Sequence, residues 1–338
     1  MGARAPPPHG RAIAMVITES AMVCAVGHTA ASACAAKRAC LSGFGELPFR
    51  DGAGEPVIGA PVAILEWTLP RSSRLLAMLG MALEELLHQC AGSQWERVAL
   101  LVCLAEPGRP GWNAELADFI IPLLQEQLGV TFHRTASRVL NAGPTGAFEA
   151  LRVAHEALAV SNVGACVVCG VDSFIDAATL RWLDGHYRLK TAANRDGLIP
   201  GEAAAAVLVR AAQAPDAGVE VAGLGFGIEA AHLLSGEPLL AHGLTTAVRE
   251  ALEQANVGLH EIDLRLSYVT GARSADDGRD QARAFFGLIP ASRVADEVRD
   301  DRAGYAEQHR DQDASAVFTR HHELRESANN ETDDESRA

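Results

Sequence analysis

Strand-length apolar runs that alternate with amphipathic segments constrain the fold more than any other feature of this chain. Residues 97–104 and 165–171 are apolar almost throughout, which is typical of strands buried on both faces. Segments of helical periodicity lie around them. In the longest, residues 71–90, leucine recurs every fourth residue from Leu75 to Leu87. This order predicts an α/β protein with mostly parallel sheets that helices cover on both faces.

Composition limits the classes of function. Of the 338 residues, 48% are hydrophobic and 21% are charged, as in a soluble globular protein with a large core. The formal charge of −14 disfavours a nucleic-acid partner, because binding phosphates requires a basic surface. No apolar run reaches the roughly 18 residues of a membrane span, and residues 1–11 lack the apolar core of a signal peptide. We therefore expect a cytoplasmic protein with no membrane contact and no nucleic acid.

The two ends of the chain differ from the rest. We expect residues 1–11, which are polar and rich in proline, to be a disordered extension. Periodicity stops near residue 293, and residues 296–338 carry 13 acidic and 6 basic side chains. Such a composition buries too little apolar surface to fold, so residues 293–338 are predicted to be an acidic, disordered tail. A genuine truncation and a reading-frame shift in the gene would both produce this abrupt change.

Three motifs that suggest a metal or a phosphate have plainer interpretations. Cys166 and Cys169 have the spacing of a zinc knuckle, but residues three apart in a strand point to opposite faces, and no second ligand pair follows. The glycine-rich residues 223–227 lack the spacing of a dinucleotide site, so a sharp strand end or a bulge is the better interpretation. His321 and His322 lie in the polar tail without flanking ligands. We expect neither a metal nor a cofactor.

The strongest local signal is the segment 194–209. A polar turn that contains Asp196 leads through Gly201 into an alanine-rich strand, whose small side chains let backbone layers approach closely. Glu202 begins this strand, and a carboxylate buried there without partners would be costly. We therefore expect Glu202 to be a hydrogen-bonded structural carboxylate, with Asp196 and Gly201 shaping the turn before it.

Three landmarks in order along the first 210 residues resemble the β-ketoacyl synthases of the thiolase superfamily. Residues 195–203 are similar to the family's Arg-Asp-Gly, apolar step and Gly-Glu-Gly, with Ala203 in place of the last glycine. Residues 169–173 are similar to its strand-ending Gly-Gly-x-Glu/Asp-Ser, and residues 23–43 to its opening strand, helix and glycine-containing stop. The resemblance implies a thiolase-like layered αβαβα fold with mostly parallel or mixed sheets.

The same resemblance divides the chain into two halves. Residues 12–217 correspond to the N-terminal half of a ketoacyl synthase, and residues 218–292 to part of the C-terminal half. The last strands of the family, which supply a glycine-rich oxyanion loop, are missing. The chain is thus expected to have an incomplete second half.

The position that the family gives to its nucleophilic cysteine holds a glycine here. Family members condense acyl groups through a thiolate at a helix N-terminus, where the helix dipole lowers the thiol pKa, with backbone N–H groups that bind the thioester oxyanion. The matching strand-to-helix turn is residues 141–147, and Gly143 stands at the nucleophile position. Glycine forms no acyl-enzyme. Thr145 has no visible base beside it, so we expect its hydroxyl to cap the following helix.

The two histidines of the family are also absent from their motifs. Tyr268 stands where the first histidine would begin a His-Gly-Thr-Gly-Thr motif, and Thr270 with Gly271 match its continuation. The second histidine should follow in a Lys-x-x-x-Gly-His context, but His309 has neither the glycine nor the apolar strand. The resemblance therefore implies a degenerate member that has lost its condensing chemistry.

The leading hypothesis is a thiolase-fold protein without condensing activity. Its old groove would bind an acyl group or an acyl carrier protein through Asn141, Gly143, Thr145 and Thr270. Family members commonly dimerise through the strand beside the nucleophile turn, here residues 139–143. The resemblance thus implies a homodimer, or a heterodimer with an active synthase like that of the chain length factors.

Two alternatives stay open. An active acyltransferase of the 3-oxoacyl-carrier-protein synthase type would need Cys103 or Cys169 as its nucleophile, and both lie in predicted strands where the pKa of a thiol rises. An accessory protein for a bacterial secretion effector is the other alternative, on the weak likeness of residues 182–191 to such thiolase-like proteins.

Overall fold

The computed structural model describes residues 15–159, 162–212, 218–229, 238, 240–267 and 286–290. Within this range, everything up to His260 belongs to one compact unit. Several features discussed above lie outside the described residues: Tyr268, Thr270, Gly271, His309, His321, His322, the N-terminal extension and the acidic tail.

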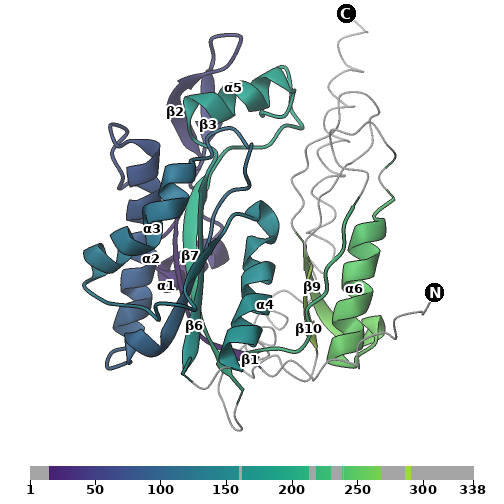
Figure 1. Ribbon diagram of the computed structural model, residues 1–338. Coiled ribbons are helices and arrows are strands. Elements are labelled where there is room, and N and C mark those ends of the chain that lie inside the picture. Colours follow the sequence, from purple (N-terminus) through teal and green to yellow (C-terminus); the bar gives the residue numbers. More distant parts are fainter. Residues whose placement is uncertain are drawn as a thin grey trace, which may run out of the picture. The chain divides into compact units, whose positions relative to one another are not determined.

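A six-stranded mixed sheet organises the large unit (Figure 1). Its order is β5 (Arg138–Leu140), β4 (Val98–Cys103), β6 (Ala165–Ser173), β7 (Glu202–Ala211), β1 (Met15–Cys24) and β8 (Val219–Val221). The first three strands are parallel to one another, whereas β6, β7, β1 and β8 pair antiparallel. The two apolar runs predicted as buried strands are β4 and β6, and the α/β class is confirmed.

Helices cover both faces of this sheet (Figure 1). On one face lie α1 (Ala30–Arg38), α2 (Arg71–Gln89) and α3 (Ala114–Leu128), and on the other lies α4 (Gly146–Leu158). Alternate residues of β4 enter the two cores: Leu100 packs with the α2 side and Leu101 with the α4 side. The strand is buried on both faces because each face has its own helical layer.

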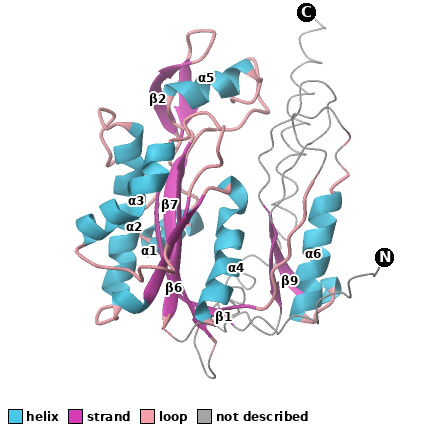
Figure 2. Ribbon diagram, viewed as in Figure 1, coloured by secondary structure: helices cyan, strands magenta, loops and turns pink. Residues whose placement is uncertain are grey.

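The segment between β6 and β7 explains why the sheet is mixed. It stays at one end of the sheet, where α5 (Ala177–Gly185) packs beside the hairpin of β2 (Gly45–Arg50) and β3 (Pro56–Gly59) (Figure 2). Because the chain never returns to the opposite end, β7 runs back along β6, and Ser173 pairs with Glu202. These peripheral elements enclose a small core of their own, which includes Leu47, Val57, Leu180 and Leu183.

The glycine-rich residues 223–227 are neither a sharp strand end nor a bulge. They run extended along α6 (His242–Ala255), and a Cβ on any of their three glycines would overlap the helix backbone at Gly243, Ala247 or Ala251. The glycines are needed because a strand-like segment lies directly on a helix face made of small residues. This close approach is the feature that the sequence interpretation missed.

Two shorter features complete the described part. Strand β9 (Ile262–Ser267) pairs with β10 (Phe286–Pro290) in a two-stranded sheet. Among the helices that the structure describes, none is long and apolar enough to cross a membrane.

Candidate functional site at the β5–α4 turn

Gly143 lies at a strand-to-helix turn. Strand β5 ends at Leu140, and a 3₁₀ turn, η2 (Gly143–Thr145), leads directly into α4. The φ angle of Gly143 is +54°, a left-handed conformation that a residue with a Cβ adopts at a cost. The chain thus turns sharply from β5 into α4, and a glycine stands at the position of the turn that has the left-handed conformation.

The polar groups of the turn bond to the turn itself and to the end of β4. The amide of Gly143 donates to the carbonyl of Leu104 at 3.1 Å, and the amide of Thr145 donates to that of Ala142 at 3.3 Å. The hydroxyl of Thr145 also donates to Ala142, at 2.9 Å. The expected N-cap bond from Thr145 is absent, because this residue is already helical and its side chain turns back into the 3₁₀ turn. Neither amide is free for a carbonyl ligand.

A carboxylate from another loop occupies the space beside Gly143. A Cβ on Gly143 would overlap Oε2 of Glu106 and would lie 2.8 Å from its Cδ. Oε2 of Glu106 is buried and has no hydrogen-bond partner among the described residues, and the same is true of Oδ1 of Asn141. The sequence analysis missed Glu106, because no motif marks it and its contact with Gly143 spans 37 residues of chain.

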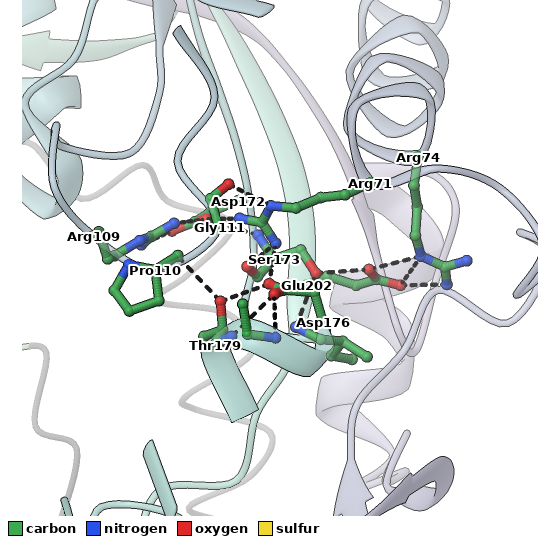
Figure 3. Close-up of polar contacts among 12 residues, drawn as sticks. Arg71, Arg74, Arg109, Pro110, Gly111, Asp172, Ser173, Asp176, Thr179 and Glu202 are labelled. Carbon is green, nitrogen blue, oxygen red and sulfur yellow. Dashed lines mark hydrogen bonds and ion pairs between the residues drawn. The ribbon is translucent and has the colours of Figure 1, made fainter. Parts of the chain in front are cut away.

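Arg109 fixes the loop that carries Glu106. Its guanidinium forms a two-pronged ion pair with Asp172, with Nη1 to Oδ2 at 2.6 Å and Nη2 on Oδ1 (Figure 3). It also lies 4.9 Å above the ring of Phe174. Burial acts to lower the pKa of Arg109, but the hydrogen bond and charge of Asp172, with the charges of Glu106 and Asp176, raise it above its usual value. Arg109 is therefore a permanent cation next to the carboxylate of Glu106.

A second arginine holds the far end of the same loop. Nε of Arg71 donates to the carbonyl of Gly111 at 2.8 Å, and its Nη1 donates to Asp176 at 2.7 Å and to the carbonyl of Ser173 at 2.8 Å (Figure 3). Asp176 in turn caps α5, and the hydroxyl of Thr179 donates to the carbonyl of Pro110 at 3.1 Å. Loop 105–113 is thus tied to the sheet and to α5 on several sides.

Glu202 belongs to a fully paired cluster that meets the Arg71 network at Ser173. Glu202 and Arg74 are 6% and 5% exposed, and Nη2 of Arg74 lies 2.6 Å from Oε1. The carboxylate also accepts from Nε of Arg74, from the Val62 amide at 2.8 Å and from the Ser173 hydroxyl at 3.0 Å (Figure 3). So many donors offset the cost of burying the charge.

The turn before Glu202 is held by backbone contacts. The carbonyl of Gly201 accepts from the amide of Phe174 at 2.9 Å, and Gly201 bridges to Ala60 of the β3 end. Asp196 lies exposed in the turn of residues 195–197. Gly201 thus positions the start of β7 beside the end of β3.

The cysteines of the central strands are buried thiols. Burial raises the pKa of Cys103, at the end of β4, to about 12, and raises that of Cys169 well above its usual value. Cys166 packs with the α4 side of the sheet and Cys169 with the α2 side, as expected for neighbours three apart in a strand. In the described part of the chain, no three His, Cys, Asp or Glu side chains converge on a metal position.

A pocket of about 380 Å³ opens near the N-termini of α2 and α3. Leu75, Leu104, Leu116 and Val171 contribute apolar walls, and Arg71, Trp112 and Asp172 contribute polar groups. The charges of Arg71 and Asp172 are already used within the network described above. The pocket therefore has apolar walls, and its charged lining residues are the paired Arg71 and Asp172 together with Glu115.

Comparison with solved structures identifies the architecture. The chain superposes on a type II polyketide synthase complex of an acyl-carrier protein with its ketosynthase bound to the hexaketide (AntDE:AntF), with a TM-score of 0.62 and 13% identity over 79% of this chain and 76% of that one. The chain has the thiolase-like fold of the ketosynthases. The identity is low, so this likeness concerns the fold alone.

Two further ketosynthase structures match with lower scores. The ketosynthase ApeO in complex with its chain length factor ApeC from Xenorhabdus doucetiae gives a TM-score of 0.52 and 16% identity over 74% of this chain and 70% of that one. The ishigamide ketosynthase/chain length factor gives 0.52 and 17% over 72% and 74%. No protein-family model matches the sequence, and no curated protein does. The ketosynthase-like expectation for the fold is confirmed.

Proposed function

We propose that this chain is a ketosynthase-like partner subunit without condensing activity. The observation that carries the proposal is the β5–α4 turn, where Gly143 has no side chain and the carboxylate of Glu106 lies against it. An acyl-enzyme needs a nucleophile at this kind of turn and donors for the oxyanion. Here the amides of Gly143 and Thr145 are already bonded to the carbonyls of Leu104 and Ala142.

A relocated cysteine is a poor substitute. Cys103 and Cys169 are 8% and 2% exposed, and burial raises both thiol pKa values. Catalytic thiols require the opposite environment, an accessible and electropositive one that lowers the pKa. The accessory role suggested by residues 182–191 and the cytoplasmic location stay predictions.

The free edge of the large sheet supports a dimer partner. Strand β5 is the outermost strand at one end of the sheet, so one side of it has no strand beside it within the described residues. Helix α3 packs against β5 and carries Phe119 and Leu123, one turn apart and 61% and 39% exposed. An edge strand flanked by exposed apolar side chains is a surface that a second chain can extend and cover.

Two of the similar structures are ketosynthases with a chain length factor, and another holds an acyl-carrier protein. By analogy we infer that this chain binds an active synthase or a second copy of itself across β5, with an acyl carrier protein as the further partner. Substituting Phe119→Asp together with Leu123→Asp should abolish the dimer in size-exclusion chromatography with light scattering. The matched control is Val219→Asp on β8, which lies at the opposite edge of the sheet and is 57% exposed.

The proposed lack of condensing activity is tested with an acylation and condensation assay. Purified protein incubated with an acyl-carrier-protein thioester and a malonyl-carrier-protein extender should gain no acyl mass and form no condensed product, while an active synthase in parallel does both. An acyl adduct on the wild-type chain, or a ketoacyl product in its presence alone, would overturn the non-catalytic assignment.

A further inference from the structure

We propose that Glu106 is a resident carboxylate that determines what the β5–α4 turn can accept. In that position it fills the space that a side chain at residue 143 would need, and it repels acyl oxyanions and anionic ligands. The inference deepens the proposed function and rests on it in one respect, that Gly143 stands where a nucleophile would.

The contact between Glu106 and Gly143 is the first step. The space that a Cβ at residue 143 would need contains Oε2 of Glu106, and Cδ and Cβ of Glu106 would lie 2.8 and 3.5 Å away. A side chain at this position therefore has to push aside the carboxylate group, which is the flexible end of the Glu106 side chain. Gly143 is thus constrained twice, by its φ of +54° and by the carboxylate.

The carboxylate lies in a favourable field although its Oε2 lacks a hydrogen bond. It lies at the N-terminus of α4, where the helix dipole stabilises negative charge. The cation of Arg109 interacts with it electrostatically. Oε2 of Glu106 and Nε of Arg109 are nevertheless buried without hydrogen-bond partners among the described residues. The charge of Arg109 and the helix N-terminus therefore favour the carboxylate of Glu106 at the turn, although its Oε2 has no hydrogen bond there.

The anchoring of loop 105–113 fixes the backbone that carries Glu106. Arg109 is paired with Asp172 on β6, and Gly111 is bonded to Arg71 on α2. Glu106 would have to rotate its side chain within a loop that is tied down three residues later. A ligand with an anionic or carbonyl oxygen would meet a negative charge instead of free amides.

This geometry predicts the behaviour of a thiol introduced at the turn. In Gly143→Cys the new thiol would face the carboxylate, and like charge raises the pKa of a thiol and slows its alkylation. Removing the carboxylate leaves the thiol at the helix N-terminus, which lowers its pKa. A difference of one pKa unit is about a tenfold change in the thiolate population at neutral pH.

The experiment measures how fast iodoacetamide labels the thiol introduced by Gly143→Cys at neutral pH, by peptide-resolved mass spectrometry. We compare Gly143→Cys alone with the same change combined with Glu106→Ala, Glu106→Gln or Glu126→Ala. The Glu106→Ala combination should label at least about tenfold faster than the single variant. Glu106→Gln should give an intermediate rate, because it keeps the volume and removes the charge. Glu126 is exposed on α3, so its replacement should leave the rate unchanged.

Equal rates in the single variant and the Glu106→Ala combination would overturn the inference. Because Gly143→Cys introduces backbone strain, Gly143→Ala in the wild-type and Glu106→Ala backgrounds supplies a second measurement. The fall in Tm caused by Gly143→Ala should be smaller without Glu106, and an equal fall would also overturn the inference. Neither result concerns partner binding or acylation of the wild-type chain, so failure here and failure of the proposed function are distinguishable.

Discussion

Two glutamates in this molecule carry buried carboxylate oxygens but have opposite surroundings. Glu202 accepts from the guanidinium of Arg74, a backbone amide and a hydroxyl. Oε2 of Glu106 has no hydrogen-bond partner among the described residues and lies against the bare Cα of Gly143. A carboxylate whose oxygens are hydrogen-bonded, like that of Glu202, stabilises the fold. A carboxylate with a buried oxygen that has no hydrogen bond, like that of Glu106, instead fills the space that a side chain at residue 143 would need. The matched change of glutamate to glutamine, which keeps the shape and removes the charge, compares their roles directly.

The largest effect is expected at Glu202. Glu202→Gln leaves the 5% exposed guanidinium of Arg74 without a counter-charge, and breaking a buried pair in this way costs about 3–5 kcal/mol of unfolding free energy. Urea denaturation followed by circular dichroism measures it. Replacing both partners, Arg74→Met with Glu202→Leu, should recover much of the loss. If Glu202→Gln costs less than about 1 kcal/mol, water reaches the pair and the contrast with Glu106 disappears.

The thiol of Cys103 lies beneath the same turn and gives a pH-dependent effect. A Cβ on Gly146 would lie 3.1 Å from Cβ of Cys103, and burial raises the pKa of this thiol to about 12 from an ordinary value of 9.0. The unfolded chain releases this proton from pH 9 upward and the folded chain does not. Stability from Cys103 is thus complete below pH 9 and falls by about 1.4 kcal/mol per pH unit between pH 9 and 12.

Thermal denaturation from about pH 8 to about pH 11 measures this decline. Cys103→Ala should make the fall of stability with pH shallower, because one buried thiol no longer titrates. Cys34→Ala, at an exposed position, should leave the pH dependence unchanged. An unchanged slope in Cys103→Ala would mean that the thiol is accessible in the folded protein, and would revive the relocated-nucleophile alternative.

A smaller effect is expected where loop 105–113 is fastened. Arg109→Ala removes the two-pronged bond to Asp172, whose side chain is 45% exposed, so solvent screening limits the cost to about 1 kcal/mol. Amide hydrogen exchange in residues 105–113 should accelerate, and exchange in β7 beside Glu202 should not. Equal protection of the loop in the variant would show that the bonds from Arg71 and Thr179 hold it without Arg109.

The sequence predicted the parts of the fold that depend on local pattern. The apolar runs became β4 and β6 because periodicity and burial act over a few residues. That Glu202 needs hydrogen-bond partners followed from its place at the start of a buried strand. That Arg74, 128 residues away, is its main partner could not be predicted from the sequence. The cap expected from Thr145 failed because a 3₁₀ turn precedes α4. Glu106 was beyond prediction, since its place at Gly143 depends on the path of a loop that distant arginines fix.

The smallest effect is expected at Glu106. Glu106→Gln loses the attraction of the helix N-terminus and of Arg109, each worth a few tenths of a kcal/mol, and gains by removing a charge whose Oε2 is buried without a hydrogen bond. These terms oppose each other, so the unfolding free energy should change by no more than about 0.5 kcal/mol. The urea denaturation used for Glu202→Gln also measures the change in unfolding free energy of Glu106→Gln. The two losses of unfolding free energy can then be compared directly. A loss of about 2 kcal/mol or more would make Glu106 a structural anchor like Glu202, because a carboxylate that only occupies the turn contributes little to holding the fold together.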